Sequence, residues 1–383
     1  MEKTTLRQKL SHHWFCVQGV LFPHLEETYG PLTKHHQLLV SVLDFIRIER
    51  HVHYNYTCVG RPLDDRHAIF RAFIAKAVFN IATTVLLRER LLSDPTLRRM
   101  CGFQGKWDIP SASTFSRAFA EFSKTALPDR VHEALIDLHQ KERLVGHTSY
   151  DSTAIDAREC VDPVRKIEMK QNAADEKQKK KNANSKMKRG RPKKGTPPKE
   201  KEATRLERQQ AMSFSEMIHD LPKVCDIGRK QNSKGLYTQW KGYKLHLATA
   251  DGGIPLAAIV TAASLHDSQA ALPLMHLVNN RVTHLYDVMD SAYDATIIRQ
   301  TSQTNGCVPL IDFNCRTSND TRAFAPHEAE RYKERSVAER MNARLKDEFG
   351  ARSIYVRGDA KIKAHLMMGV LALTVDQLLR LIQ

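Results

Sequence analysis

Apolar residues in the first 140 positions recur at the three- and four-residue spacing of amphipathic helices. Within 36–47 the spacing is carried by Leu38, Leu39, Val42, Leu43 and Ile46. A longer stripe of the same kind runs through 70–86 and predicts one continuous helix. Another helix is expected over 111–122, with Ser111 or Ser113 as its N-cap. The pattern therefore predicts an all-α region over residues 1–140.

The pattern changes near residue 144, where short runs rich in strand-forming residues begin. Residues 243–247 alternate apolar and polar side chains, and Asp251-Gly252-Gly253 supplies a tight turn after them. The expected strands are 144–155, 243–247, 256–261, a run that ends at Asp290, and 307–311. The expected helices are 268–278, 293–303 and two at the end of the chain. Residues 141–383 thus predict a mixed sheet with helices on its faces, that is, an α/β fold.

A basic insertion of about 160–230 interrupts this second region. The chain has a net charge of +16, and residues 165–208 alone hold 17 Lys and Arg against 6 Asp and Glu. Few large apolar side chains occur there, so the insertion predicts a flexible segment that contacts a polyanion such as nucleic acid. Arg189 and Arg191 lie in an Arg-Gly-Arg-Pro sequence thin enough for an A·T-rich minor groove, in the manner of an AT-hook. A solvated linker has the same composition.

Seven cysteines are scattered along the chain without any Cys-x-x-Cys spacing, which disfavours a disulfide framework and a zinc finger. The N-terminal residues lack the apolar core of a secretory signal. The longest apolar run, 367–375, is too short to span a bilayer. We therefore expect a cytoplasmic protein in a reducing compartment, with no membrane partner.

Four polar residues near the end of the chain fall on one side of a predicted helix: Tyr332, Arg335, Glu339 and Lys346. Their offsets of 3, 4 and 7 keep them within about 60° of one another at 100° per residue. The buried side of the same helix is expected to consist of Val337, Met341, Leu345 and Phe349. A solvent-exposed helix with ion pairs would look similar, so the pattern needs further carboxylates to indicate a catalytic site.

Two aspartates stand where strands of the α/β region would place them. Asp151 lies in the first strand, and Asp290 ends a later one. Mg²⁺ and Mn²⁺ prefer oxygen ligands, and a pair of such ions can catalyse in-line displacement at a phosphodiester. Taken singly, each Asp fits the role of a strand-end cap or a turn residue better than that of a metal ligand, and Asp156 is a rival to Asp151.

The spacing Tyr332-x2-Arg335-x3-Glu339-x6-Lys346 resembles the signature of the IS4/IS5-type insertion-sequence transposases, members of the DDE (Asp-Asp-Glu) superfamily. Further similarity covers most of the chain outside the insertion. In the helical region it includes 60–65, 91–103 and 110–122, and in the α/β region 151–155, 243–268, 290–295 and 356–373. The resemblance implies a ribonuclease-H-like catalytic domain after a helical DNA-binding domain.

The resemblance also implies an activity and its residues. Asp151, Asp290 and Glu339 would bind the metal ions, and Tyr332, Arg335 and Lys346 would contact DNA. The expected function is metal-dependent cleavage and strand transfer of element ends, on inverted terminal repeats and target DNA, by a homodimer or larger assembly. A nuclease of the same fold without strand transfer and a non-catalytic DNA-binding descendant are the alternatives. Many relatives have Asp-Lys-Gly-Tyr where this chain has Asp290-Ser291-Ala292-Tyr293, which weakens the case for DNA contacts there.

Three other features have two interpretations each. The helix over 111–122 carries Arg117 among Ser and Thr residues and is expected to bind DNA as part of a helix-turn-helix, although packing helices share its pattern. Trp240 could stack on an unpaired base or pack beside its strand. His266-Asp267 could support the catalytic site or cap the helix that follows.

Overall fold

The computed structural model describes residues 5–52, 64–161, 203–231, 235–314, 324–352 and 354–382. Helices fill the first part of the chain, as predicted. They are α1 (Leu6–Cys16), α2 (Phe22–Tyr29), α3 (Lys34–Ile46), α4 (Arg66–Val78), α5 (Thr84–Ser93), α6 (Pro95–Cys101), α7 (Ala112–Lys124) and α8 (Leu127–Gln140). Ser111 caps α7 by accepting a hydrogen bond from the backbone N–H of Thr114 at 3.3 Å.

The single helix predicted over 70–86 is wrong, because the chain turns in the middle of it. Helix α4 ends at Val78, Asn80 adopts a left-handed conformation with φ of 49°, and the Thr83 side chain caps the start of α5. Asn tolerates this conformation better than most residues do. As a result Val85 and Leu86 point to solvent, with exposed fractions of 58% and 48%.

The second part of the chain forms a mixed six-stranded sheet. Its strands are β1 (Leu144–Asp156), β2 (Asp226–Gln231), β3 (Tyr237–Ala250), β4 (Pro255–Ala262), β5 (Thr283–Met289) and β6 (Val308–Ile311). The strand order is β2-β3-β1-β5-β6, and β4 also pairs with β3. Strand β1 is antiparallel to β3 and parallel to β5, and β5 is parallel to β6.

This topology agrees with the predicted ribonuclease-H-like fold: an antiparallel run β1-β3-β4 followed by two parallel strands. The connections contain α12 (Ala271–Arg281) between β4 and β5 and α13 (Thr296–Thr304) between β5 and β6. Parallel neighbours need such crossover helices because a tight turn cannot join them. The short helices α10 (Arg205–Gln209) and α11 (Phe214–Asp220) precede β2.

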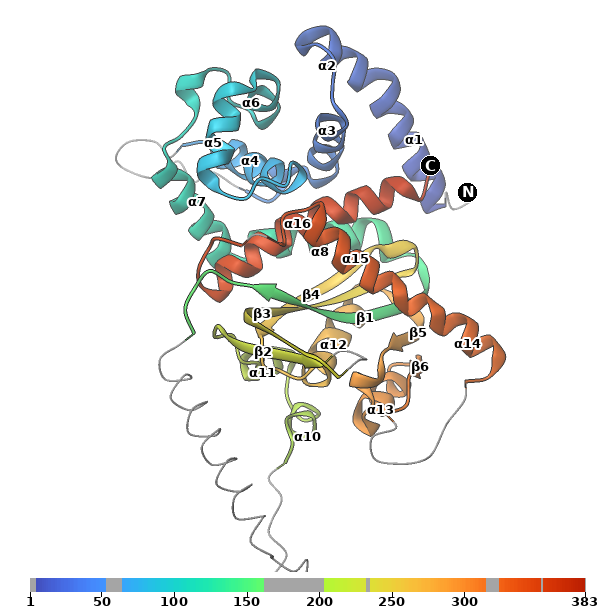
Figure 1. Cartoon of the computed structure of the whole chain (residues 1–383). Coiled ribbons are helices and arrows are strands. Elements are labelled where there is room, and N and C mark those ends of the chain that lie inside the picture. Colours follow the sequence, from blue (N-terminus) through green and yellow to red (C-terminus); the bar gives the residue numbers. More distant parts are fainter. Residues whose placement is uncertain are drawn as a thin grey trace, which may run out of the picture.

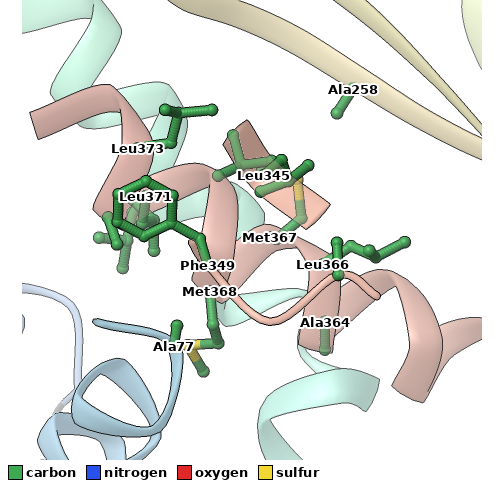
Figure 2. Packing of buried hydrophobic residues seen from close by; sticks show 14 of the residues in the cluster. Ala77, Ala258, Leu345, Phe349, Ala364, Leu366, Met367, Met368, Leu371 and Leu373 are labelled. Atoms are coloured by element: carbon green, nitrogen blue, oxygen red, sulfur yellow. The ribbon is translucent and has the colours of Figure 1, made fainter. Parts of the chain in front are cut away.

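The last three helices are α14 (Pro326–Tyr332), α15 (Ser336–Asp347) and α16 (Asp359–Arg380). Helix α16 lies between the helical region and the sheet, where it packs against α3, α4, α7 and α8 on one side and β4 on the other (Figure 1). Figure 2 shows side chains of α4, α15, α16 and β4 in one cluster, with Ala77 beside Met368. The chain changes from helices to strands between Gln140 and Leu144, and both parts share one hydrophobic core. The division into domains at 1–140 and 141–383 stays a prediction.

Among the described residues, only α16 has the length and apolar composition of a membrane-spanning helix, and 83% of its apolar stretch is buried in the structure. The position of α16 explains this composition, because it is enclosed by protein on nearly every side. Gly369 allows the closest approach: a Cβ there would lie 2.6 Å from the carbonyl oxygen of Phe349, just after α15. Helix α16 thereby fixes the end of α15, which covers the sheet next to β1 and β3.

Candidate active site

The pairing of β1 with β5 places Asp151 beside Asp290. The two strands run parallel, and their last registered pair is Tyr150 with Met289. Asp151 follows Tyr150 in β1, and Asp290 follows Met289, the last residue of β5. Neighbouring strands lie about 4.8 Å apart, so two adjacent backbone positions carry these carboxylates on the same edge of the pair.

Both carboxyls have raised pKa values. Burial raises the pKa of Asp151 to about 6, and the charge of Asp290 adds to the effect, while a hydrogen bond from Asn342 opposes it. Burial also raises the pKa of Asp290, and the charge of Asp267 raises it further. The backbone N–H of Ala292 donates to Asp290 Oδ1 at 2.9 Å, and this hydrogen bond lowers the pKa. Two half-buried carboxylates that repel each other form a site in which a divalent cation would be stabilising.

Helix α15 brings Glu339 to this edge of the sheet. The helix packs against β1 and β3 with its buried stripe of Val337, Met341 and Leu345, as predicted. Glu339 remains 48% exposed on its side chain, and Arg335 Nη1 lies 2.6 Å from Glu339 Oε1. The charges of Glu339 and Asp290 both act on Arg335, so this guanidinium lies near the helix carboxylate and near Asp290.

The predicted helix is not continuous, because a 3₁₀ turn over Lys333–Arg335 separates α14 from α15. Tyr332 ends α14, and its ring packs against Phe324 at a centroid distance of 4.8 Å. Arg335 still lies over the Tyr332 ring, with Cζ at 6.0 Å from the centroid. The turn therefore leaves Tyr332, Arg335 and Glu339 on one side of the α14–α15 segment.

Asn342 is a residue of the site that the sequence analysis missed. Its Nδ2 donates to Asp151 Oδ2 at 2.9 Å, from one turn after Glu339 on the buried side of α15. The offset of three residues from Glu339 is the sequence signal that could have revealed it. This hydrogen bond fixes one oxygen of Asp151, and the backbone N–H of Ser152 also donates to the carboxylate.

Lys346 and Asp156 lie further along the same face. Burial lowers the pKa of Lys346, and the negative charges of Asp156 and Asp151 oppose that shift, so the ammonium lies near both. Asp156 is exposed at the end of β1 and pairs with Gly242 in β3, beyond the last residue of β1 that pairs with β5. The geometry therefore favours Asp151 over Asp156 as the partner of Asp290.

A third aspartate, Asp267, completes the electrostatic surroundings. It starts the 3₁₀ turn before α12 and pairs with Lys244 of β3, whose Nζ lies 2.8 Å from Asp267 Oδ1. Burial would raise the pKa of Asp267, but the ion pair with Lys244 and a hydrogen bond from Ser152 hold it below its usual value. His266 is exposed, and its ring bonds to Ser268, so the residue of this dipeptide that acts on Asp290 is Asp267.

Two residues of strands β2 and β3, Lys230 and Trp240, have different roles. The positive charge of Lys230 in β2 acts on both Asp151 and Asp290, although nothing in the sequence pattern singled it out. Trp240 donates from Nε1 to the carbonyl of Tyr243 at 2.9 Å and lies so close to Gly228 that a Cβ there would collide with its ring. Packing accounts for Trp240 in this structure.

The predicted DNA-contacting residues outside the sheet are only partly described. Arg117 is exposed on α7 and reaches its own helix, with Nη2 at 3.4 Å from Thr114 Oγ1. Among the described residues, Arg117 makes no hydrogen bond or ion pair with Asp151, Asp290 or Glu339. Arg189, Arg191 and the AT-hook-like sequence lie outside the described residues.

A second polar cluster lies on the opposite face of β5 and is distinct from the carboxylate site. Asp287 accepts hydrogen bonds from Tyr150 at 2.8 Å and Ser302 at 2.6 Å, and its Oδ1 lies 2.7 Å from His284 Nε2. Cys307 Sγ completes the group at 3.4 Å from the same nitrogen. These fully buried groups hydrogen-bond to one another, which identifies a structural network beneath the sheet.

Comparison with protein families agrees with this geometry. The model for a "Transposase DDE domain" matches residues 219–375, and that for a "Transposase domain (DUF772)" matches residues 28–121. The chain belongs to the DDE transposases. Together the two matched ranges cover about two thirds of this transposase, one in the helical region and one in the sheet region.

The matched ranges also bear on individual residues of the transposase. Asp290, Glu339 and the Tyr332–Lys346 segment fall inside the DDE match, whereas Asp151 precedes it. The position of Asp151 in the site therefore rests on the pairing of β1 with β5. No curated protein and no solved structure matches this transposase.

Proposed function

We propose that Asp151, Asp290 and Glu339 are the catalytic carboxylates of this DNA transposase. The parallel register of β1 and β5, which makes Asp151 and Asp290 neighbours, is the observation that carries the proposal. Support comes from α15, which places Glu339 over the same edge and joins Asp151 through Asn342. The IS4/IS5-type subtype suggested by the Tyr-Arg-Glu-Lys spacing is part of the proposal.

The three carboxylates suit Mg²⁺ or Mn²⁺, with a two-metal site as our proposal. Each offers oxygen atoms, and the raised pKa values of Asp151 and Asp290 show that the protein alone does not fully compensate their charge. When bound, such ions polarise a phosphodiester and lower the pKa of an attacking water or DNA 3′-hydroxyl. Superfamily members use this chemistry both to cut DNA and to join an end to a target.

The residues of this chain then have separate tasks. Asn342 holds one oxygen of Asp151, so the carboxylate keeps a fixed orientation toward Asp290. Arg335 is paired with the half-exposed Glu339, and a DNA phosphate could draw the guanidinium away as Glu339 turns to a metal. Tyr332, Arg335 and Lys346 lie along one side of α14–α15, in line with the contacts to a DNA backbone that we propose for them.

For the insertion sequence as a whole, we propose that the transposase binds inverted terminal repeats and target DNA as a homodimer or larger assembly. Arg117 on the exposed side of α7, and Arg189 and Arg191 in the basic insertion, are the proposed contacts outside the catalytic region. A strongly basic chain gains affinity by releasing counterions from DNA.

The test compares Asp151→Asn with Asp156→Asn, two substitutions on the same strand. The substrate is a plasmid that carries the inverted repeats flanking the reading frame, incubated with Mg²⁺ or Mn²⁺. Loss of a ligand that contributes several kcal/mol to the transition state lowers the nicking rate by roughly 10²- to 10³-fold. We expect this loss in Asp151→Asn and near-wild-type nicking in Asp156→Asn; the opposite result would transfer the role to Asp156.

A second readout separates transposition from the alternatives. Labelled element ends should become covalently joined to a target plasmid when the metal is present. Nicking without joining would indicate a nuclease, and footprinting of the ends without any metal-dependent cleavage would indicate a non-catalytic DNA-binding protein.

A further inference from the structure

A basic pocket lies at the junction of the helical region and the catalytic region, away from the carboxylates. Its volume is about 310 Å³, at the low end of ligand pockets. Side chains of α4, α5 and α7 line one part of it, and residues 355–365, from the segment before α16 into its first turns, line the other. Exposed residues such as Ser116 and Arg357 belong to the lining, so the pocket is open to solvent.

Lys76 of α4 lines this pocket and is buried, with only 7% of the residue exposed. Among the described residues no carboxylate pairs with its ammonium, and burial alone accounts for its pKa, which is lowered to about 8. Its stem is buried and its ammonium faces the pocket, where little water reaches it, and lysines buried to this extent are usually paired with a negative charge. With a pKa of about 8, the Lys76 ammonium is still mainly protonated at neutral pH.

The other polar groups of the pocket are suited to an anion. Arg357 and Lys361 add two positive charges, and Thr84 and Ser116 add hydroxyl donors, while none of the lining residues in the described part of the chain is acidic. Thr84 is also the first residue of α5, whose N-terminal end favours negative charge. These groups come from four separate elements, which distinguishes the pocket from an ordinary lysine-rich surface.

His365 occupies the inner part of the same lining as a neutral group. Burial and the neighbouring Lys76 lower its pKa to about 3, and its Nε2 lies 3.0 Å from the carbonyl of Gly350, to which it donates. The imidazole is therefore uncharged at neutral pH and adds no positive charge to the pocket. The cationic character of the pocket rests on Lys76, Arg357 and Lys361.

We propose that this pocket binds a backbone phosphate of the element DNA, with Lys76, Arg357 and Lys361 as the ligands. The inference rests on DNA binding by this transposase and is independent of which carboxylates are catalytic. The bound phosphate would pair with the ammonium of Lys76 and would hold the helical and catalytic regions on the same DNA segment.

The position of the pocket suits DNA that also reaches the active site. Ile354 pairs with Ala157 directly after β1, so the segment that leads to Arg357 begins at the end of the strand that carries Asp151. Six strand residues span about 20 Å, which is less than one turn of duplex DNA. The start of this segment therefore lies within one turn of duplex DNA of Asp151.

The test measures binding of end-sequence duplex DNA to the full chain in EDTA, so cleavage plays no part. Lys76→Met keeps the aliphatic stem and removes the charge, and Lys141→Met, at an exposed lysine after α8, is the matched control. We expect Lys76→Met to weaken binding about tenfold and to reduce the slope of log K against log salt by about one. Lys141→Met should change neither quantity.

A scan with single uncharged methylphosphonate linkages then locates the phosphate. One linkage should weaken binding to the wild type about tenfold and have no effect on Lys76→Met. If Lys76→Met binds with wild-type affinity and salt slope, or if it stays sensitive to every linkage that affects the wild type, the proposal is wrong. Should this variant fail to fold, Arg357→Gln and Lys361→Gln take its place with the same expectations.

Inorganic phosphate distinguishes a free anion from DNA. Millimolar phosphate should raise the thermal midpoint of the wild type more than that of Lys76→Met, which supports an anion site. Phosphate stabilisation without any linkage-specific loss would show that the pocket takes a free anion and would overturn the assignment to DNA. Loss of cleavage in carboxylate variants affects none of these binding measurements.

Discussion

A hydrogen bond from Asn342 ties the helix of the active site to strand β1. Asn342 donates to Asp151 at 2.9 Å, and its amide is buried in the interface between α15 and β1. Groups that orient a metal ligand affect metal affinity nearly as much as the ligands themselves. Asn342 is therefore a positioning residue, which acts through Asp151.

Replacing Asn342 by Ala should lower the affinity for Mn²⁺ by about 10- to 100-fold. The pKa of Asp151 should rise further, because the lost hydrogen bond is one of the interactions that lower it. Calorimetric titration of the full chain with Mn²⁺ measures the effect, and Asn280→Ala on the exposed side of α12 is the control. If both the Mn²⁺ affinity and the thermal midpoint were unchanged, Asn342 would not be a positioning residue of the metal site.

The buried network beneath the sheet should make stability depend on pH. Burial opposes the charged form, but hydrogen bonds with Asp287 and Cys307 raise the pKa of His284 to about 9. The unfolded imidazole titrates near 6.5, so the native state holds this proton more tightly. The resulting stabilisation is complete below pH 6.5 and is lost as the pH rises through 9.

We therefore expect the thermal midpoint of the wild type to fall between pH 6.5 and 9 by more than that of His284→Gln. The difference between the two proteins isolates His284 from other titrating groups. Parallel pH curves for both proteins would show that His284 is not charged in the native state.

Among the elements, α15 depends on α16 for its position. Leu345 and Phe349 at the end of α15 lie against Leu371 and its neighbours on α16 (Figure 2). Gly369 makes this contact possible, because a Cβ there would lie 2.6 Å from the Phe349 carbonyl and 3.0 Å from a methyl of Leu345. The carbonyl belongs to the backbone, so it cannot move aside without shifting the end of α15.

Gly369→Ala should therefore destabilise the protein by about 1–3 kcal/mol, the usual cost of overpacking a core. The matched control is Gly19→Ala, since a Cβ at Gly19 meets nothing within 4 Å. Urea unfolding of both variants measures the difference. Equal stability of the two variants would contradict the close packing of α15 on α16.

The sequence predicts the helices and strands whose apolar residues recur at a regular spacing, or which end in a carboxylate. Asp290 follows its strand as expected, and Val337, Met341 and Leu345 form the buried stripe of α15. The break after Val78 was not predictable, because it depends on the turn at Asn80 and the cap at Thr83 within an otherwise helical stripe.

The parts of the two sites that escape prediction depend on pairings between distant segments. Lys230 acts on Asp151 and Asp290 only because β2 extends the sheet beside β3. Lys76 looks like an ordinary helix lysine in the sequence, and its burial follows from the segment before α16, nearly 300 residues later in the chain. Single-sequence patterns contain no information about such contacts.

At the scale of the whole molecule, the helical region and the sheet share one core. Helix α16 contacts α3, α4, α7 and α8 as well as β4, so its apolar side chains are covered from both directions (Figure 1). Neither region can be removed without exposing a large part of α16. The arrangement also keeps the basic pocket and the carboxylate site in a fixed relation within the described chain.

The shared core predicts a single cooperative unfolding transition for the described regions. Calorimetry should give one peak, and a chain that lacks residues 1–140 should fail to fold because α16 would lose its cover. Two resolved transitions, one of them retained after that deletion, would show that the regions fold separately.

The most direct test of the central assignment exchanges one metal ligand for a softer one. Asp290→Cys replaces a carboxylate with a thiolate, which is a poor ligand for Mg²⁺ and a better one for Mn²⁺. Nicking of the element-end plasmid by this variant should fall at least a hundredfold in Mg²⁺ and recover at least tenfold in Mn²⁺, relative to the wild type in each metal. Wild-type nicking by Asp290→Cys in Mg²⁺ would contradict the account.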